Sequence, residues 1–327
     1  MDELIADYIY KMELGQLQEH QGMGVFPLYQ KGGECTYLTL TEALQGEVLT
    51  VTEIDDVASV PELKVQNHAD MPVLLLDGEE LVGAKQNRVL NTTILLKPQS
   101  VTVIPVSCTE QGRWSYNSLE FAESGNVASY RMRRTKSASV NTSLRQKGEF
   151  YSNQRLVWDE IDEVSEKART KSNTRALQDV YHSRRRDLDE YLESFPLEEG
   201  QKGLLVMVNG EVMGLDIISS ASAYQLLHQK ILKSYALEAM LNEGGEGEGT
   251  FNGPERARSF LDDVRLSVDD KHKSVGYGWD HRLEGPQIVG SALTYQDQVI
   301  HTAFFQMEEN EKIGAMSSYR KRRDFRS

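Results

Sequence analysis

Short runs of β-branched and aliphatic residues, each bounded by turn-forming residues, fill the first third of this 327-residue chain. A run of this kind is long enough for a strand, and the Gly, Asp or Gln-Gly punctuation at its ends favours a turn. The runs occupy residues 25–29, 36–40, 48–52, 72–76, 89–96 and 101–106. Closely spaced strands with tight connections predict a β-sandwich or a partly closed barrel.

Helical spacing of apolar residues marks the second half of the chain. It recurs over residues 157–168 and 177–195, which predicts two helices packed as an antiparallel pair. A further helix is expected to begin near Ser222, where Gln225 three residues later completes a capping box. A Gly-Pro pair at 253–254 opens another, because proline is tolerated at the first position of a helix.

Strand pairs are expected among these helices. An Asn-Gly pair between residues 204–208 and 211–217 predicts a hairpin with a type I′ turn, and residues 287–294 and 298–306 predict a second pair. The fold class predicted is therefore α+β. We expect a β-rich N-terminal sandwich or partly closed barrel packed with a helical C-terminal lobe that contains β-hairpins.

Composition places the chain among soluble globular proteins, with 39% hydrophobic and 26% charged residues. The net charge of −14 repels nucleic acid, so no sequence-specific nucleic-acid interface is predicted. Two cysteines are too few for a disulfide framework. The acidic start lacks the features of a secretory signal, and no apolar run approaches the roughly 18 residues that cross a bilayer. We expect a cytoplasmic protein without membrane contact.

Polar and charged segments divide the chain into four parts. They are a β-rich lobe, a basic connecting segment, a helical lobe and a flexible basic tail, at residues 1–123, 124–153, 154–307 and 308–327. Alternatively, residues 1–307 form one composite domain. Residues 124–146 have few apolar side chains to anchor them, which predicts an extended, mobile connection. Its cations are Arg131, Arg133, Arg134, Lys136 and Arg145. The Gly- and Glu-rich stretch 244–249 predicts a flexible linker.

Turn signals are expected to join three of the N-terminal runs and the short segment 81–82 into two hairpins. A proline-containing turn connects residues 89–96 to 101–106. An Asp-Gly pair, among the stronger two-residue hairpin signals, connects residues 72–76 to 81–82. Both hairpins are expected to be antiparallel.

The first of these hairpins is expected to bring two polar stretches together at one end of a sheet. If Leu96 faces Val101, the register brings Cys108 level with Val89. The side chains gathered there are Gln86, Asn87, Arg88, Cys108, Glu110 and Arg113. Arginine binds phosphate or carboxylate and amides recognise a base or sugar edge, so a ligand site is predicted. Its binding residues are expected to be Glu80, Lys85, Gln86, Asn87, Arg88, Asn91, Gln111, Arg113 and Trp114. A polar network that closes a wide turn is the alternative explanation.

Two motifs are distinctive: LLLDGEELVGAKQNRVLN at 74–91 and IPVSCTEQGRW at 104–114. They resemble a bacterial domain family named for its association with ADP-ribosylglycohydrolases and rhodanese/phosphatase-superfamily proteins. Residues 191–195 and 210–216 are compatible with it, so the resemblance covers most of the chain up to about residue 305. It implies a setting in ADP-ribose, nucleotide or phosphoester metabolism, in stress, repair or defence. It implies no particular reaction and no catalytic residue.

Three residues are candidates for catalysis. Cys108 is a candidate nucleophile because nearby arginines favour a thiolate; the alternative is a small buried side chain at the end of a strand. Glu79 and Glu110 are candidates for a general acid and base. Glu79 and Glu80 are adjacent and point to opposite faces of a strand, so at most one of them joins Glu110.

Motifs for metals and cofactors are absent from the sequence. The seven histidines form no HxH or HExxH pattern, and there is neither a CxxC motif nor a glycine-rich phosphate loop. We therefore predict no metal and leave the cofactor open. Two hypotheses follow: a pocket protein that binds or acts on a small anionic, nucleotide-like metabolite, or a non-enzymatic interaction module that recruits a partner through residues 124–146. Whether the protein is an enzyme is left open as well.

Overall fold

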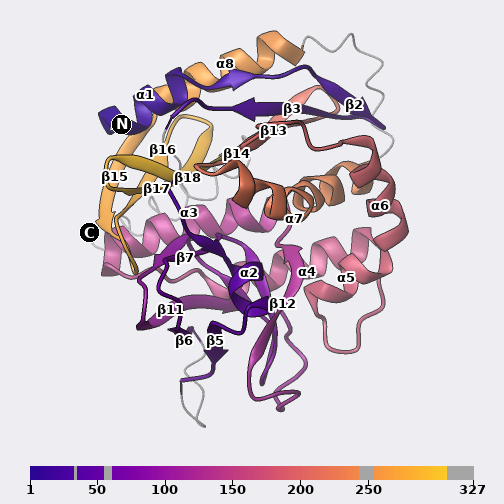
Figure 1. Ribbon diagram of the computed structural model, residues 1–327. Helices are drawn as coiled ribbons and strands as arrows, with labels where there is room; N and C mark the ends of the chain where they lie inside the picture. Colours follow the sequence, from indigo (N-terminus) through magenta and orange to yellow (C-terminus); the bar gives the residue numbers. More distant parts are fainter. Residues whose placement is uncertain (33–34, 55–60, 243–252, 308–327) are drawn as a thin grey trace, which may run out of the picture.

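Helices and strands are mixed along the whole chain in the computed structural model, which describes residues 1–32, 35–54, 61–242 and 253–307 (Figure 1). Helix accounts for 34% and strand for 35%, and the strands include a curled half-barrel sheet, so the predicted α+β class is confirmed. The stretches predicted to be flexible at 244–249 and 308–327 lie outside the described residues. No helix in the described ranges is long and apolar enough to cross a membrane.

The largest sheet has nine antiparallel strands and combines both ends of the chain. Its strands are β1 (Glu13–Leu14), β2 (Gln18–His20), β3 (Met23–Tyr29), β13 (Gly203–Val208), β14 (Glu211–Ile218), β15 (Val268–Lys273), β16 (Trp279–Glu284), β17 (Ile288–Tyr295) and β18 (Gln298–Gln306). Their order is β1-β3-β13-β14-β18-β17-β16-β15, with β2 beside β3. The N-terminal strand β3 therefore pairs with β13, which lies far away in the sequence.

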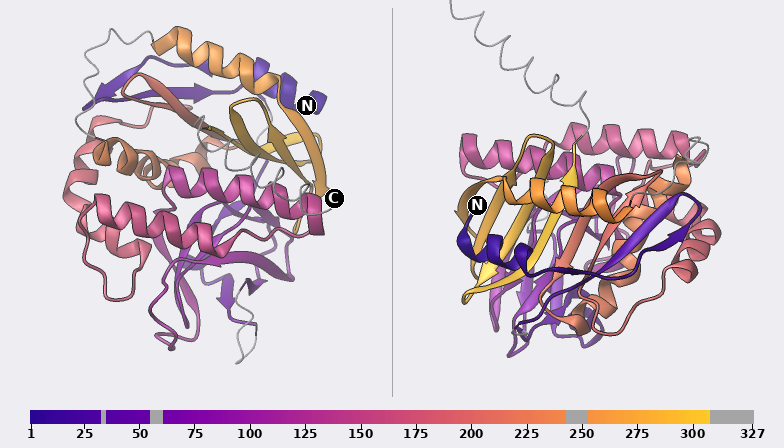
Figure 2. Two further views of the ribbon diagram at one scale, coloured as in Figure 1. Left: turned by 180° about the vertical axis from the view of Figure 1, so that it is seen from behind. Right: turned by 90° about the horizontal axis from the view of Figure 1, so that it is seen from above.

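Side chains of this sheet alternate between two hydrophobic cores on its opposite faces. On β13, Leu204 and Val206 belong to one core, whereas Leu205 and Met207 belong to the other. The first core also contains α7 (Ala221–Leu241), and the second contains α1 (Glu3–Tyr10) and α8 (Gly253–Arg265). Figures 1 and 2 show α1 and α8 lying side by side over the outer face.

Two smaller sheets form the other half of the molecule around a third core. One has the order β12-β8-β9-β11-β6-β5 and the other β10-β7-β4. The strands are β4 (Leu38–Thr39), β5 (Leu49–Thr52), β6 (Glu62–Asn67), β7 (Val73–Leu75), β8 (Glu79–Gly83), β9 (Arg88–Leu90), β10 (Ile94–Leu96), β11 (Ser100–Cys108) and β12 (Phe121–Val127). Helix α2 (Leu40–Gln45) begins with a capping box at Thr39 and packs on this core.

The predicted hairpin of residues 89–96 and 101–106 is wrong in its pairing. The first half of β11 pairs with β6, and only its second half pairs with β9, with Cys108 opposite Arg88 rather than Val89. Strand β10 leaves to pair with β7 in another sheet, so Leu96 does not face Val101. The break has a physical cause: the side chains of Thr92 and Thr93, between β9 and β10, bind Asp280 and His301 of the large sheet.

The predicted Asp-Gly hairpin is also wrong. Strands β7 and β8, on either side of Asp77 and Gly78, belong to different sheets and do not pair. Gly78 has a φ of 87° and bonds through its backbone to Leu90 and Ala128. The left-handed glycine therefore lets the chain pass from one sheet to another rather than reverse on itself.

The basic connection is not extended. After β12 the chain forms α3 (Tyr130–Lys147), which is capped by Ser129 and buries nine of its residues. The buried residues include Arg133, Arg134 and Lys136, so this polar segment forms a buried helix. The proposed division into parts at 124 and 154 stays a prediction, although α3 packs between the sheets as part of the core.

Most of the local predictions for the C-terminal half are confirmed. Helices α4 (Gln154–Lys167), α5 (Leu177–Ser183) and α6 (Arg185–Ser194) occupy the expected regions, although the second expected helix is broken at Arg184. The β13–β14 hairpin has the positive φ at Asn209 and Gly210 that a type I′ turn requires. The capping box at Ser222 is wrong, because the side chain that caps α7 is that of Ser220.

Candidate functional site

Residues far apart in sequence meet where β11 ends. The backbone N–H of Leu177 donates to Thr109 at 3.0 Å, and that of Gly112 donates to Thr174 at 2.7 Å. Glu110 and Ala176 form an antiparallel bridge between these bonds. The segment before α5 therefore extends the sheet edge and carries the first turn of α5 to the polar motif.

A pocket of about 340 Å³ lies at this junction. Three of the predicted site residues, Asn87, Glu110 and Arg113, line it. The remaining lining residues are Val82, Gly83, Asn117, Ser118, Thr174, Ala176, Gln178 and Asp179. The sequence motif therefore does contribute one wall, while the opposite wall comes from the start of α5.

A larger pocket of about 580 Å³ adjoins the first, because both are lined by Gln178 and Asp179. Its other lining residues are Ser124, Asn126, Tyr181, His182, Arg185, Leu188, Asp189, Leu192, Gln229 and Lys233. We call these two hollows the paired pockets. The size of the larger one is typical of a small-molecule site.

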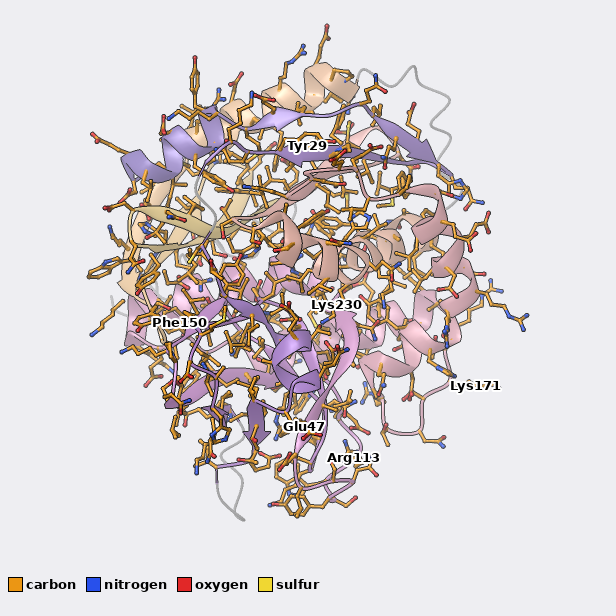
Figure 3. All side chains as sticks on the ribbon, viewed as in Figure 1. Tyr29, Glu47, Arg113, Phe150, Lys171 and Lys230 are labelled. Carbon is orange, nitrogen blue, oxygen red and sulfur yellow. The ribbon has the colours of Figure 1, made fainter. Side chains whose placement is uncertain are left out.

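Arg113 has a fixed position at the smaller pocket, and Figure 3 shows it at the lower end of the molecule. Its guanidinium donates to Glu110 Oε2 at 2.6 and 2.9 Å and to Asn87 Oδ1 at 3.1 Å. It also donates to the carbonyl oxygens of Gly83, Ala84 and Ser115. Arg113 thus closes the turn between β8 and β9, as the alternative explanation from the sequence expected, and holds the Glu110 carboxylate at the pocket wall.

Glu80 is a buried carboxyl group beside the paired pockets. Its Oε1 accepts from the Thr109 hydroxyl at 2.8 Å. Burial raises the pKa of Glu80 to about 7; the hydroxyls of Thr109 and Ser124 oppose this rise, and the charges of Glu110 and Asp179 add to it. A carboxyl group tuned in this way next to a cleft is typical of functional sites.

The larger pocket supplies cations and amides that no sequence signal indicated. Lys233 donates to Gly125 O at 2.7 Å and to Asn126 Oδ1 at 2.8 Å, and burial together with the charge of Lys230 lowers its pKa. His182 and Arg185 are exposed at the rim. Gln178, Asp179, His182, Arg185 and Lys233 were missed because they are ordinary polar positions of amphipathic helices until the fold assembles them.

The remaining motif residues form a separate cluster behind the pocket wall. Arg88 is fully buried, and its Nη1 donates to Gln86 Oε1 at 3.0 Å and to Cys108 Sγ at 2.7 Å. Its Nη2 lies 3.5 Å from Glu53. The predicted site is thus divided, because Asn87 and Arg88 are successive residues whose side chains take part in different clusters.

Other predicted site residues have structural partners. Glu79 is buried in an ion pair with Lys230 at 2.9 Å, with Lys230 in the middle of the molecule (Figure 3). Asn91 binds Ser107 and the carbonyl of Phe150. Lys85 lies 4.9 Å over the ring of Tyr116, Gln111 is half-buried, and Trp114 is exposed with its ring 6.0 Å from the Arg88 guanidinium. Their roles in ligand binding stay predictions.

Cys108 is expected to be an unreactive thiol. It is buried, and burial raises the pKa of Cys108 although the Arg88 charge opposes this rise. In a Cys35→Ser background near neutral pH, we expect iodoacetamide to alkylate native Cys108 at least about tenfold more slowly than the urea-unfolded chain. Mass spectrometry of timed samples measures both rates. Equal alkylation rates in the native and the unfolded chain would contradict this prediction and support Cys108 as a nucleophile.

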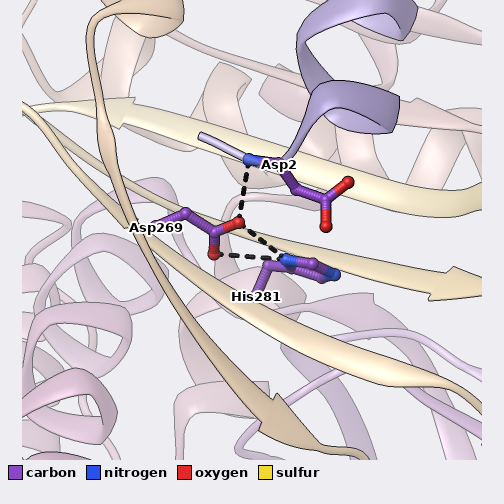
Figure 4. Close-up of side chains that lie close together, drawn as sticks. All are labelled: Asp2, Asp269 and His281. Atoms are coloured by element: carbon purple, nitrogen blue, oxygen red, sulfur yellow. Dashed lines mark hydrogen bonds and ion pairs between the residues drawn. The ribbon is translucent and has the colours of Figure 1, made fainter.

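One group of described residues brings three potential metal ligands within 4.8 Å of one another: Asp2, Asp269 and His281 (Figure 4). Each already has a protein partner. His281 Nδ1 lies 2.9 Å from Asp269 and its Nε2 lies 3.0 Å from Thr294, while Asp2 pairs with Lys271 at 3.1 Å. We interpret this cluster as an ion-pair network that ties the start of α1 to the edge strand β15.

The fold is that of an α+β protein with a half-barrel sheet, and the paired pockets are hollows lined mainly by polar side chains. The model of the ARPP-1 domain, the ARG and Rhodanese-Phosphatase-superfamily-associated Protein domain, matches residues 11–305. The chain therefore belongs to this family, as the two motifs indicated. Searches of curated proteins and of solved structures give no significant match.

Proposed function

We propose that the paired pockets bind a small anionic metabolite of nucleotide type, with ADP-ribose as the first candidate. One observation carries the proposal: two adjoining pockets share Gln178 and Asp179 and together place an ammonium group beside several amides and carboxylates. The association recorded in the family description agrees with an ADP-ribose setting.

The chemistry of the lining residues supports this class of ligand. Lys233 and the rim residues Arg185 and His182 favour a phosphate in the larger pocket, against the negative charge of the protein as a whole. Carboxylates such as Glu110 and Asp179 accept hydrogen bonds from ribose hydroxyls, and amide side chains recognise a base edge. A diphosphate flanked by two sugars offers partners for both the cationic and the accepting groups.

Ligand binding by the Lys233→Met variant tests the proposal. We expect ADP-ribose to raise the melting temperature of the wild type, and Lys233→Met to weaken binding at least about tenfold, because a charge-assisted hydrogen bond is lost. Isothermal titration with ADP-ribose, ADP, AMP and ribose 5-phosphate measures the affinities. Lys171→Met removes an exposed lysine outside the pockets and serves as the matched control.

The result of the control decides the interpretation. If Lys171→Met weakens binding as much as Lys233→Met does, the ligand responds to overall charge and the paired pockets are not its site. If none of the four compounds binds at millimolar concentration, the proposed ligand class is wrong.

The alternative is a non-enzymatic module that recruits a partner through residues 124–146, and fewer observations support it. Arg133, Arg134 and Lys136 are buried. Arg131 and Arg145 reach the surface, where they pair with Glu163 at 2.8 Å and Glu284 at 2.7 Å. The cations on which this alternative depended are therefore already engaged within the protein.

A further inference from the structure

A third pocket, of about 190 Å³, is lined in part by α1, which lies at the opposite end of the molecule from Arg113 (Figures 1 and 3). Its walls come from α1, from the residues that follow β3, and from the turn between β17 and β18. Further lining residues are Lys202 before β13, Ser219 after β14, and Gln298 and Val299 at the start of β18. None of its lining residues belongs to the paired pockets.

Three buried polar atoms that line this pocket have no hydrogen-bond partner among the described residues. They are Tyr8 Oη, Gln30 Oε1 and Gln298 Oε1. Gln30 is only 8% exposed, and its Nε2 donates to the carbonyl of Tyr8 at 2.7 Å. That bond identifies which end of the amide is the oxygen, so the unpaired atom of Gln30 is an acceptor. Buried polar groups usually have hydrogen-bond partners, so three unpaired ones at one pocket make it a candidate ligand site.

The chemistry of the unpaired groups limits what the ligand is. Burial raises the pKa of Tyr8, so its hydroxyl stays protonated and donates to an acceptor. Two amide oxygens require donors from the ligand. Lys202, which is buried in the wall, adds a positive charge, and Asp297 adds a negative one. A small ligand that complements this pocket therefore carries both a hydrogen-bond donor and an anionic acceptor.

We propose that this pocket binds a free α-amino acid. Its ammonium group donates to Gln30 and Gln298, and its carboxylate accepts from the Tyr8 hydroxyl and faces Lys202. A zwitterion satisfies both kinds of unpaired group, whereas a simple anion or a simple amine satisfies only one. The pocket is smaller than a typical drug-sized site, in agreement with a ligand of this size.

A thermal-shift screen of the common amino acids at millimolar concentration, followed by calorimetry, tests the proposal. We expect at least one amino acid to raise the melting temperature, and its N-acetyl and carboxamide derivatives to have no effect. Tyr8→Phe is expected to weaken binding at least about tenfold through loss of the hydrogen bond to a carboxylate. Tyr10→Phe changes an exposed tyrosine of the same helix and should leave the affinity unchanged.

The stability of the ligand-free protein provides a second test of the inference. Because the Tyr8 hydroxyl has no partner in the described chain, Tyr8→Phe should leave the stability of the ligand-free protein unchanged or raise it. A clear loss of stability would mean that the hydroxyl is already satisfied, and the inference would be overturned. It is overturned as well if no amino acid binds, since ordered water then accounts for the unpaired atoms.

Discussion

Replacing Asp216 by alanine is expected to lower the free energy of unfolding by about 3–5 kcal/mol, because a buried guanidinium loses its counter-ion. Asp216 is fully buried on β14 and accepts from Arg133 of α3 at 2.5 and 2.9 Å. It also accepts from the Tyr235 hydroxyl at 2.8 Å and lies 3.3 Å from His301 Nε2. Burial by itself would raise the pKa of Asp216, but the charge of Arg133 and the hydrogen bonds from His301 and Arg133 together outweigh it and lower the pKa to about 2.

Urea denaturation of the wild type and of two variants measures this effect. Asp162 and Arg175 form a surface pair of the same chemistry, with the Arg175 Nε 2.8 Å from Asp162, so Asp162→Ala is the matched control. The control should cost less than about 1 kcal/mol, because exposed pairs contribute little. Similar losses for Asp216→Ala and Asp162→Ala would contradict the role of the buried pair.

The Asp216 pair belongs to a larger network of buried charges that joins the layers of the molecule. Lys136 of α3 bonds to Asp77, which lies between β7 and β8. His301 of β18 bonds to Thr93, which lies between β9 and β10. Buried ion pairs and hydrogen bonds, as well as apolar cores, therefore hold the sheets, α3 and the connections together.

Replacing Glu80 by glutamine is expected to stabilise the protein at alkaline pH and to remove part of its pH dependence. The folded-state pKa of Glu80 is about 7, above its ordinary value of 4.5, so the protonated form is the one that folding favours. Its contribution is complete below the ordinary pKa and is lost as the pH rises through 7. Between those limits the wild type should lose about 3 kcal/mol that Glu80→Gln, which stays neutral, retains.

Urea titrations of both proteins at about pH 5 and about pH 8 measure the difference. Glutamine preserves the acceptor for the Thr109 hydroxyl, so the variant changes charge and little else. Glu120→Gln removes an exposed carboxylate just before β12 and is expected to leave the pH dependence as it is. Parallel pH profiles for wild type and Glu80→Gln would show that Glu80 is not protonated in the folded state.

Local sequence patterns were sufficient for several elements of the fold. The Asn-Gly turn defined the β13–β14 hairpin, and apolar periodicity located α4 and the region of α5 and α6. These signals succeed because turn conformation and amphipathic spacing depend on neighbouring residues. The two motifs also indicated the family and one wall of the smaller pocket.

Only the tertiary structure decided which strands pair, which charges are buried and where the paired pockets lie. Helix α3 was predicted to be a mobile linker because its buried face carries three cations among few apolar residues. Their partners, such as Asp216 for Arg133, lie far away in the sequence. Gln178 and Asp179 likewise meet Asn87 and Glu110 only after distant segments pair. A buried charge and a solvated one look alike in sequence, since what distinguishes them is a counter-ion brought by the fold.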